Sequence, residues 1–175
     1  MRNVEIKAFL RNPDFVKAKA KELSNSEPEI IKQTDTFYVV PRGRLKLRVF
    51  SDDSGELIYY ERTDAKGPKL SEYTKISFSD KSKCDGINDL LSRSNGKLGV
   101  VEKIRLLFVV GQSRIHIDKV DELGDYMEIE VVLDDNQDIE IGEKISNDLM
   151  KELGIATDDL VSEAYIDLLL RNKTS

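Results

Sequence analysis

The stretch RIHIDKVDELGDYMEIEVV, residues 114–132, alternates polar or charged side chains with apolar ones in both of its halves. Because successive side chains of a β-strand point to opposite faces, this period of two predicts two strands, each with one charged face. The charged faces carry Arg114, His116, Asp118, Glu128 and Glu130. One face thus holds a base, a histidine and an acid, and the next holds two carboxylates.

A hairpin would bring the three carboxylates of this stretch together. The connection between the two strands is short and contains Gly124, as hairpin loops often do. We therefore expect Asp118 to lie near Glu128 and Glu130. Carboxylates only a few ångströms apart raise one another's pKa, and such a cluster usually needs a cation to hold it together. The alternative is an antiparallel sheet whose charged face is simply in water.

The composition is that of a globular domain, and the net charge argues against two kinds of binding partner. With 175 residues, 39% of them hydrophobic and 34% charged, the chain is long enough for one domain with a sizeable core, at residues 1–175. The net charge of −6 argues against general binding of nucleic acid or of an anionic membrane. No apolar run reaches the length of a membrane span, and the first ten residues lack the layout of a signal peptide.

The supply of metal-binding side chains is restricted. The chain has one cysteine, Cys84, and one histidine, His116, which argues against a zinc site or a Cys–His nucleophile. A single cysteine also cannot form an internal disulfide, so a reducing, cytoplasmic setting is expected. Any metal should be held by oxygen. We place His116 outside the catalytic set, because a lone histidine is more often a hydrogen-bonded neighbour than a base.

The rest of the chain predicts six further strands and four helices. The strands are expected at residues 3–10, 33–40, 44–50, 56–64, 71–78 and 100–110. The helices are expected to begin at Pro13, Asp85, Asp138 and just after Thr157. Tyr165, in the last of them, is interpreted as a core residue or a contact at the mouth of a tunnel.

Charges of one sign gather on particular strands, which favours a closed barrel over an open sheet. About eight short antiparallel strands can close and so remove the sheet edges, which would bring the first strand beside the last ones. The inward set would comprise seven bases (Lys7, Lys46, Arg48, Arg62, Lys103, Arg105 and Arg114) and four acids (Glu5, Asp118, Glu128 and Glu130). The lumen would then carry +3 and the remainder of the chain −9, with an apolar barrel exterior covered by helices. A basic cavity beside carboxylates suits a highly charged anion that arrives with a divalent cation.

Seven segments of the sequence, in this order and spacing, resemble one known family. They are NVEIK at 3–7, DTFY at 35–38, GRLKLR at 43–48, LIYYERTD at 57–64, EKIR at 102–105, RIHIDKV at 114–120 and LGDYMEIEV at 123–131. The family is that of the CYTH proteins, or triphosphate tunnel metalloenzymes, which include class IV adenylate cyclases, thiamine triphosphatases and inorganic triphosphatases. The resemblance extends from Val4 to Leu170.

The resemblance implies a closed eight-stranded antiparallel barrel, with covering helices, around a tunnel that holds a triphosphate with Mg²⁺ or Mn²⁺. By position, the implied metal ligands are Glu5, Asp118, Glu128 and Glu130. The implied triphosphate clamps are Lys7, Lys46, Arg48, Arg62, Lys103, Arg105 and Arg114. Asp118 is implied as a further metal ligand or a water-orienting acid, and Lys7 is expected to act as a proton shuttle or a clamp, so these two are the expected catalytic residues. One position departs from the pattern: Asn3 stands where the family's first glutamate is expected.

Three functions remain open at this point. The leading hypothesis is divalent-metal-dependent hydrolysis of inorganic tripolyphosphate, a nucleoside triphosphate or thiamine triphosphate. The first alternative is a class IV-type cyclase that converts ATP to cyclic AMP and pyrophosphate. The second is a module that binds a nucleotide or polyphosphate without turning it over, and Asn3 keeps this alternative open, since an amide brings no charge to a metal. Neither nucleic acid nor a membrane is an expected partner.

Overall fold

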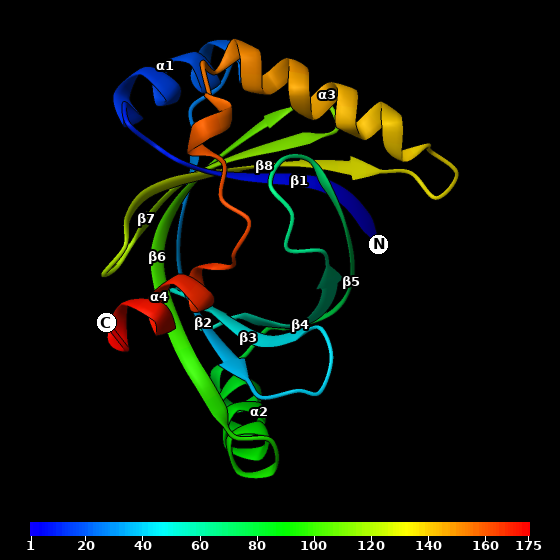
Figure 1. The fold of residues 1–175 in the computed structure, drawn as a ribbon. Helices are drawn as coiled ribbons and strands as arrows, with labels where there is room; N and C mark the ends of the chain where they lie inside the picture. Colours follow the sequence, from blue (N-terminus) through cyan, green and yellow to red (C-terminus); the bar gives the residue numbers. More distant parts are fainter.

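A computed structural model describes residues 1–175 and shows eight antiparallel strands that close into a barrel (Figure 1). The strands are β1 (Arg2–Phe9), β2 (Glu29–Tyr38), β3 (Arg44–Phe50), β4 (Gly55–Arg62), β5 (Lys69–Phe78), β6 (Lys97–Val110), β7 (Ser113–Val120) and β8 (Gly124–Leu133). Their order around the barrel is β1-β5-β4-β3-β2-β6-β7-β8. The pairing of β1 with β8 completes the ring, so the predicted closed eight-stranded barrel is confirmed.

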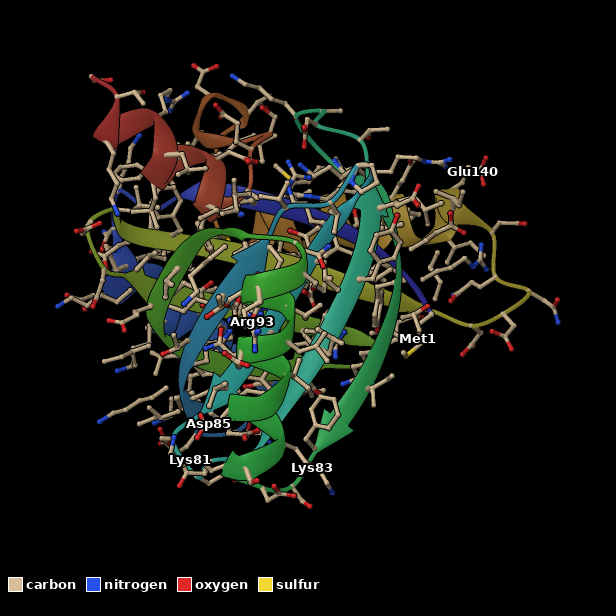
Figure 2. The ribbon with its side chains drawn as sticks, turned by 90° about the horizontal axis from the view of Figure 1, so that it is seen from below. Met1, Lys81, Lys83, Asp85, Arg93 and Glu140 are labelled. Carbon is tan, nitrogen blue, oxygen red and sulfur yellow. The ribbon has the colours of Figure 1, made fainter.

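The helices lie on the outside of this ring. They are α1 (Pro13–Ser24), α2 (Lys81–Ser94), α3 (Ile139–Glu152) and α4 (Tyr165–Lys173). α3 packs on β1 and β8, α1 on β6 and β7, and α4 on β6. α2 packs on β2 and β3, and Figure 2 shows it on the outer face of the barrel with Lys81, Lys83, Asp85 and Arg93 turned outward. None of these helices is long and apolar enough to cross a membrane.

The main hydrophobic core lies between the barrel wall and α1 and α3, and not inside the barrel. Apolar residues of β1, β7 and β8 that alternate with the charged ones point outward and are fully buried there, among them Val4, Ile115 and Ile129. α3 approaches β1 closely at Gly142, where a Cβ atom would lie 2.7 Å from the Val4 side chain. The predicted polar lumen and helix-covered apolar exterior are therefore confirmed, since both follow from strand alternation once the ring is closed.

The last helix begins later than the sequence indicated. Residues 155–164, here called the strap, pass across the open end of the ring of strands (Figure 1), and apart from a short 3₁₀ turn at Thr157–Asp159 they form no helix. The Val161 N–H donates to the Lys7 carbonyl (2.9 Å), so this part of the strap bonds to β1 and not to itself. α4 starts only at Tyr165, where the Asp167 carboxylate accepts from the Ala164 N–H (3.0 Å).

Two other elements begin four residues earlier than predicted. α2 begins four residues before Asp85, because the Asp80 side chain accepts a hydrogen bond from the Lys83 N–H (2.9 Å) and caps the helix there. β2 begins at Glu29 and not at Gln33, because its first half pairs with β6 across residues that show no clear alternation. The earlier start of α2 leaves the lumen unchanged, whereas the earlier start of β2 adds Ile31 to the lining of the lumen.

Candidate functional site

The lumen contains a cavity of about 260 Å³ lined by side chains from all eight strands. Eight basic and five acidic side chains contribute to its wall, so the lining carries a net charge of +3 with histidine neutral. All seven bases expected from the sequence line this cavity: Lys7, Lys46, Arg48, Arg62, Lys103, Arg105 and Arg114. Lys75 of β5 is the eighth. The sequence did not indicate Lys75 because polar and apolar residues alternate only weakly in its strand. In the structure its ammonium pairs with Glu56 (2.6 Å).

Three glutamates reach the cavity from adjacent strands. Glu5, Glu128 and Glu130, here called the cavity glutamates, are each 17–19% exposed. The β1–β8 register sets Glu5 directly opposite Glu130 and Lys7 opposite Glu128. Like charges in facing positions repel, so the Glu5–Glu130 pair is held only because cations lie beside it. Those cations are Arg62 on Glu5 (2.5 Å) and Arg114 on Glu130 (3.1 Å).

The cavity glutamates differ in their electrostatic surroundings. Burial raises the pKa of Glu5, and the nearby charges of Glu128 and Glu130 add to that effect, so Arg62 does not compensate. Burial would also raise the pKa of Glu128, but Lys7 and Arg105 outweigh it and hold this pKa well below the usual range. For Glu130 the neighbouring His116 and Arg114 lower the pKa against the effect of burial.

Asp118 lies close to Glu128, because one Arg105 nitrogen contacts both carboxylates (2.7 and 2.6 Å), but it does not reach the cavity. Asp118 lies opposite Tyr126 and Arg105, its side chain is fully buried, and it does not line the cavity. Both of its oxygens accept from Arg105, at 2.7 Å each, and the Tyr165 hydroxyl donates to it (2.9 Å). Burial would raise its pKa, but Arg105 and Lys103 outweigh burial and lower the pKa to about 2.

Asp35 of β2 has surroundings very similar to those of Asp118 and was absent from the expected site. It is 2% exposed and accepts from Arg48 through two nitrogens (2.8 Å each) and from Lys46 (3.1 Å). Burial opposes its ionisation, but Arg48 and Lys46 keep its pKa well below the usual range. The available signal was its position two residues from both Gln33 and Phe37, because residues two apart in a strand share a face, here the inward one.

His116, which sequence reasoning left aside, lies beside two of the cavity glutamates. The β7–β8 register sets it opposite Glu128 and sets Arg114 opposite Glu130. His116 Nδ1 lies 3.5 Å from a Glu128 oxygen and 3.9 Å from a Glu130 oxygen. Burial is the largest cause that lowers the pKa of His116. A ring nitrogen and one oxygen from each glutamate all lie within 4.8 Å of one another, a donor set that fits a divalent cation.

Tyr165, at the start of α4, closes one side of the cavity. The Lys7 ammonium lies 3.7 Å from the centre of its ring, and the Lys103 ammonium 4.8 Å. Lys7 also contacts Glu128 (3.3 Å) and donates to the Glu163 carbonyl of the strap (3.3 Å). Burial lowers the pKa of Lys7. Tyr165 thus fulfils both alternatives that the sequence left open, since it belongs to a buried hydrophobic cluster with Phe37 and Ile166 and also lines the cavity.

Comparisons with known proteins agree with this geometry. The CYTH domain family profile matches residues 1–165, and no curated protein sequence matches the chain. Among solved structures, the PH1012 protein of Pyrococcus horikoshii OT3 is 24% identical, with a TM-score of 0.80 over 95% of this chain and 98% of that one. A "putative adenylate cyclase" of Vibrio parahaemolyticus is 21% identical, with a TM-score of 0.73 over 96% of this chain and 97% of that one. These structures share the fold, and the family match shows that the chain belongs to the CYTH domain family.

Proposed function

We propose that residues 1–175 act as one domain that hydrolyses a triphosphate compound with the help of Mg²⁺ or Mn²⁺. The observation that carries this proposal is the charge of the closed cavity, where eight bases face five acids in a chain whose total charge is −6. Such a surplus inside a barrel is costly unless an anion neutralises it. A triphosphate supplies several negative charges in a linear array, which matches bases that come from strands all around the ring.

The proposed clamps are already held in place before a substrate arrives. Arg48 and Arg105 are each fixed by a bidentate contact to a buried aspartate, so their remaining N–H groups need little rearrangement to meet phosphate oxygens. On this basis we assign Asp118 a positioning role through Arg105 and Lys103, since no part of its side chain reaches the cavity. Asp35 is assigned the same role toward Arg48 and Lys46.

Glu5, Glu128 and Glu130 are the proposed ligands of the cation. When bound, a divalent cation supplies charge neutralisation at the phosphate oxygens and lowers the pKa of a coordinated water. The chain's own residues then have separate tasks. The arginines offset charge on the phosphate oxygens, and Tyr165 closes one side of the cavity beside Lys7.

The proposed step transfers the terminal phosphoryl group to water. A bond forms between the terminal phosphorus and the water oxygen, and the bond from that phosphorus to its bridging oxygen breaks. A cavity glutamate accepts the proton released by water, and Lys7 gives a proton to the departing diphosphate, a task favoured by its lowered pKa. Exchange with water in the cavity, to which the three glutamates are 17–19% exposed, then returns the protons and restores the starting state.

The test is product analysis with purified protein. Tripolyphosphate, thiamine triphosphate and ATP are each incubated with Mg²⁺ or Mn²⁺, and orthophosphate, pyrophosphate and cyclic AMP are resolved. We expect orthophosphate, lost on adding a chelator. Glu128→Gln should abolish turnover but retain triphosphate binding, whereas Glu72→Gln, on the exposed outer face of β5, should change neither. Binding without any product would overturn the proposal in favour of a binding module, and full activity of Glu128→Gln would overturn the ligand assignment.

The second candidate is cyclisation of ATP, which requires room for a nucleoside, and the apolar part of the cavity offers a surface for one. Ten of the 27 lining residues are hydrophobic, including Phe50, Ile58 and Leu107. Inorganic tripolyphosphate has no group that uses this surface, whereas a nucleoside or thiamine moiety does. In the same assay a cyclase gives cyclic AMP and pyrophosphate from ATP, so the products separate the two functions.

A further inference from the structure

We propose that the cation site of this barrel is a mixed nitrogen and oxygen site, in which His116 Nδ1 joins Glu128 and Glu130 and selects a transition-metal dication over Mg²⁺. The inference rests on the cation site of the proposed function and adds a ligand and a class of metal to it. The metals expected to gain most over Mg²⁺ are Fe²⁺, Co²⁺ and Zn²⁺, and Mn²⁺ serves as a paramagnetic probe of the same site.

Strand register builds this donor set. The hairpin between β7 and β8 places His116 and Glu128 directly opposite each other, and Glu130 is two residues further along the same face of β8. Three side chains with potential metal-binding atoms therefore point into the cavity from two neighbouring strands. Together they bring two negative charges and one neutral nitrogen, which balances the charge of a dication.

The lack of a hydrogen-bond partner at His116 Nδ1 supports a metal site independently of the strand register. His116 is 4% exposed, its Nδ1 atom is buried, and this atom has no hydrogen-bond partner. The 3.5 Å separation from Glu128 is longer than an N–H···O hydrogen bond, which spans roughly 2.7–3.2 Å. A buried polar atom without a partner costs stability, so its presence beside two carboxylates calls for a ligand. A metal ion bound there satisfies the nitrogen and both carboxylates at once.

Asn3, on the cavity wall formed by β1, favours the same class of metal. It lines the cavity two residues before Glu5 on the same face of β1, is 4% exposed, and its Oδ1 atom is also buried without a partner. Its amide brings an oxygen to this wall but no negative charge. Mg²⁺ binds carboxylate oxygen and water, whereas imidazole nitrogen favours the later first-row metals. A wall with only two carboxylates beside an imidazole nitrogen therefore lowers the advantage of Mg²⁺.

Basic side chains compete with a metal in the ligand-free protein. Arg105 and Lys7 contact Glu128, and Arg114 contacts Glu130. A polyphosphate in the cavity offers these three cations other oxygens and so leaves the glutamates to the metal. The test is therefore made with a polyphosphate present, as well as with metal alone.

The first experiment uses the fact that the chain has a single histidine. Untagged protein is prepared with natural-abundance or ¹⁵N-labelled histidine and mixed with Mn²⁺, with and without a methylene-bridged analogue of tripolyphosphate. Pulsed electron paramagnetic resonance then detects nuclei coupled to the Mn²⁺ electrons. We expect a ¹⁴N coupling that becomes a ¹⁵N coupling on labelling, and no mutation is needed to assign it to His116.

The outcomes separate the two proposals. A ³¹P coupling without a histidine coupling overturns the inference and leaves the proposed metal-bridged triphosphate intact. Absence of both couplings, or no bound Mn²⁺ under either condition, overturns the inference and also removes the metal from the proposed function. Both couplings together support both proposals.

The second experiment measures metal preference by calorimetric titration with the same analogue present. His116→Asn should lower the affinity for Co²⁺ and Zn²⁺ by about 10- to 100-fold and change Mg²⁺ affinity much less. His116→Asp gives an oxygen-only set and should shift the preference back toward Mg²⁺, which a purely structural role of His116 would not do. Glu72→Gln serves as the control for weak binding to surface carboxylates. An unchanged ratio of Co²⁺ to Mg²⁺ affinity in both folded His116 variants would overturn the inference.

Discussion

Two aspartates and three glutamates face the same set of bases inside this barrel, yet their surroundings differ. Asp35 and Asp118 are at most 2% exposed, and each binds one arginine through two nitrogens with a lysine nearby. The cavity glutamates are 17–19% exposed and share their cations with the open cavity. We infer from this difference that the aspartates hold the proposed triphosphate clamps Arg48 and Arg105 in place, whereas the glutamates stay accessible to a ligand.

The two aspartates complete the same local arrangement twice. Each of two strands carries Lys-x-Arg on its inward face, at residues 46–48 of β3 and 103–105 of β6. In both, the arginine lies directly opposite an aspartate on a neighbouring strand, Asp35 of β2 or Asp118 of β7. An opposite charge in a facing position fixes the arginine and leaves the lysine less strongly held.

The largest expected effect is on stability, from Asp118→Asn. The substitution leaves Arg105 and Lys103 buried with less negative charge, and removing one partner of a buried ion pair costs roughly 3–5 kcal/mol of unfolding free energy. Urea denaturation of the two proteins at pH 7 measures this. Asp121→Asn, in the exposed turn after β7, is the matched control and should be close to wild type. A loss of unfolding free energy below about 1 kcal/mol for Asp118→Asn would be in the range of a surface ion pair. It would contradict the distinction between the buried aspartates and the cavity glutamates.

The next effect is on turnover, from Glu130→Gln. Its partner Arg114 is 34% exposed, so water compensates for the lost charge and stability should fall by about 1 kcal/mol or less. The substitution removes a proposed ligand of the cation. Turnover with a saturating triphosphate should therefore fall by roughly 10- to 100-fold, or the affinity for the cation should fall by that factor. Kinetics and urea denaturation on the same preparation test both halves. If Glu130→Gln destabilises the protein as much as Asp118→Asn, the glutamates are structural as well.

A smaller effect is expected from acid. The pKa of Asp118 is about 2 in the folded protein, below its ordinary value of 3.8, so its charge stabilises the fold above that ordinary value. This contribution, roughly 2 kcal/mol, is lost as the pH falls through the folded pKa. The gap in unfolding free energy between wild type and Asp118→Asn should therefore narrow by about that amount between pH 5 and pH 2. A gap that stays constant over this range would show that the charge of Asp118 is not what stabilises the fold.

The smallest effect concerns the lysine that shares Asp35 with an arginine. Burial, and then the charge of Arg48, lower the pKa of Lys46 to about 7, although Asp35 acts in the opposite direction. A bound polyphosphate favours the charged ammonium, so binding at pH 8 should take up protons, with Lys46 contributing at most about one. Titration calorimetry in two buffers of different ionisation enthalpy measures the uptake. Lys46→Arg, which is charged throughout, should reduce it, and an unchanged uptake would assign the protons to other groups.

The inward-facing residues could be predicted from the sequence to a large extent, whereas their partners could not. Alternation identified all seven expected bases and the three cavity glutamates as residues of the lumen. It also led to the expectation that Asp118 would lie with Glu128 and Glu130. Asp118 does lie near Glu128, since Arg105 contacts both, but the structure sets His116 and Arg114 directly opposite the two glutamates and buries Asp118 behind Arg105. The prediction of a hairpin was correct, but its register was not resolved, and a shift of two residues keeps every side chain on the same face.

The sequence by itself determined the alternating strands, the inward charges, the need to close the sheet and the family resemblance. These depend on residues that are neighbours in the chain, since the direction of a side chain in a strand follows from the backbone alone. Only the tertiary structure decided which carboxylate is buried and which faces the cavity. It also decided that Asp35 lies beside Arg48, and that the one histidine lies within reach of two glutamates. Those contacts join separate strands, and they depend on the register and closure of the whole ring.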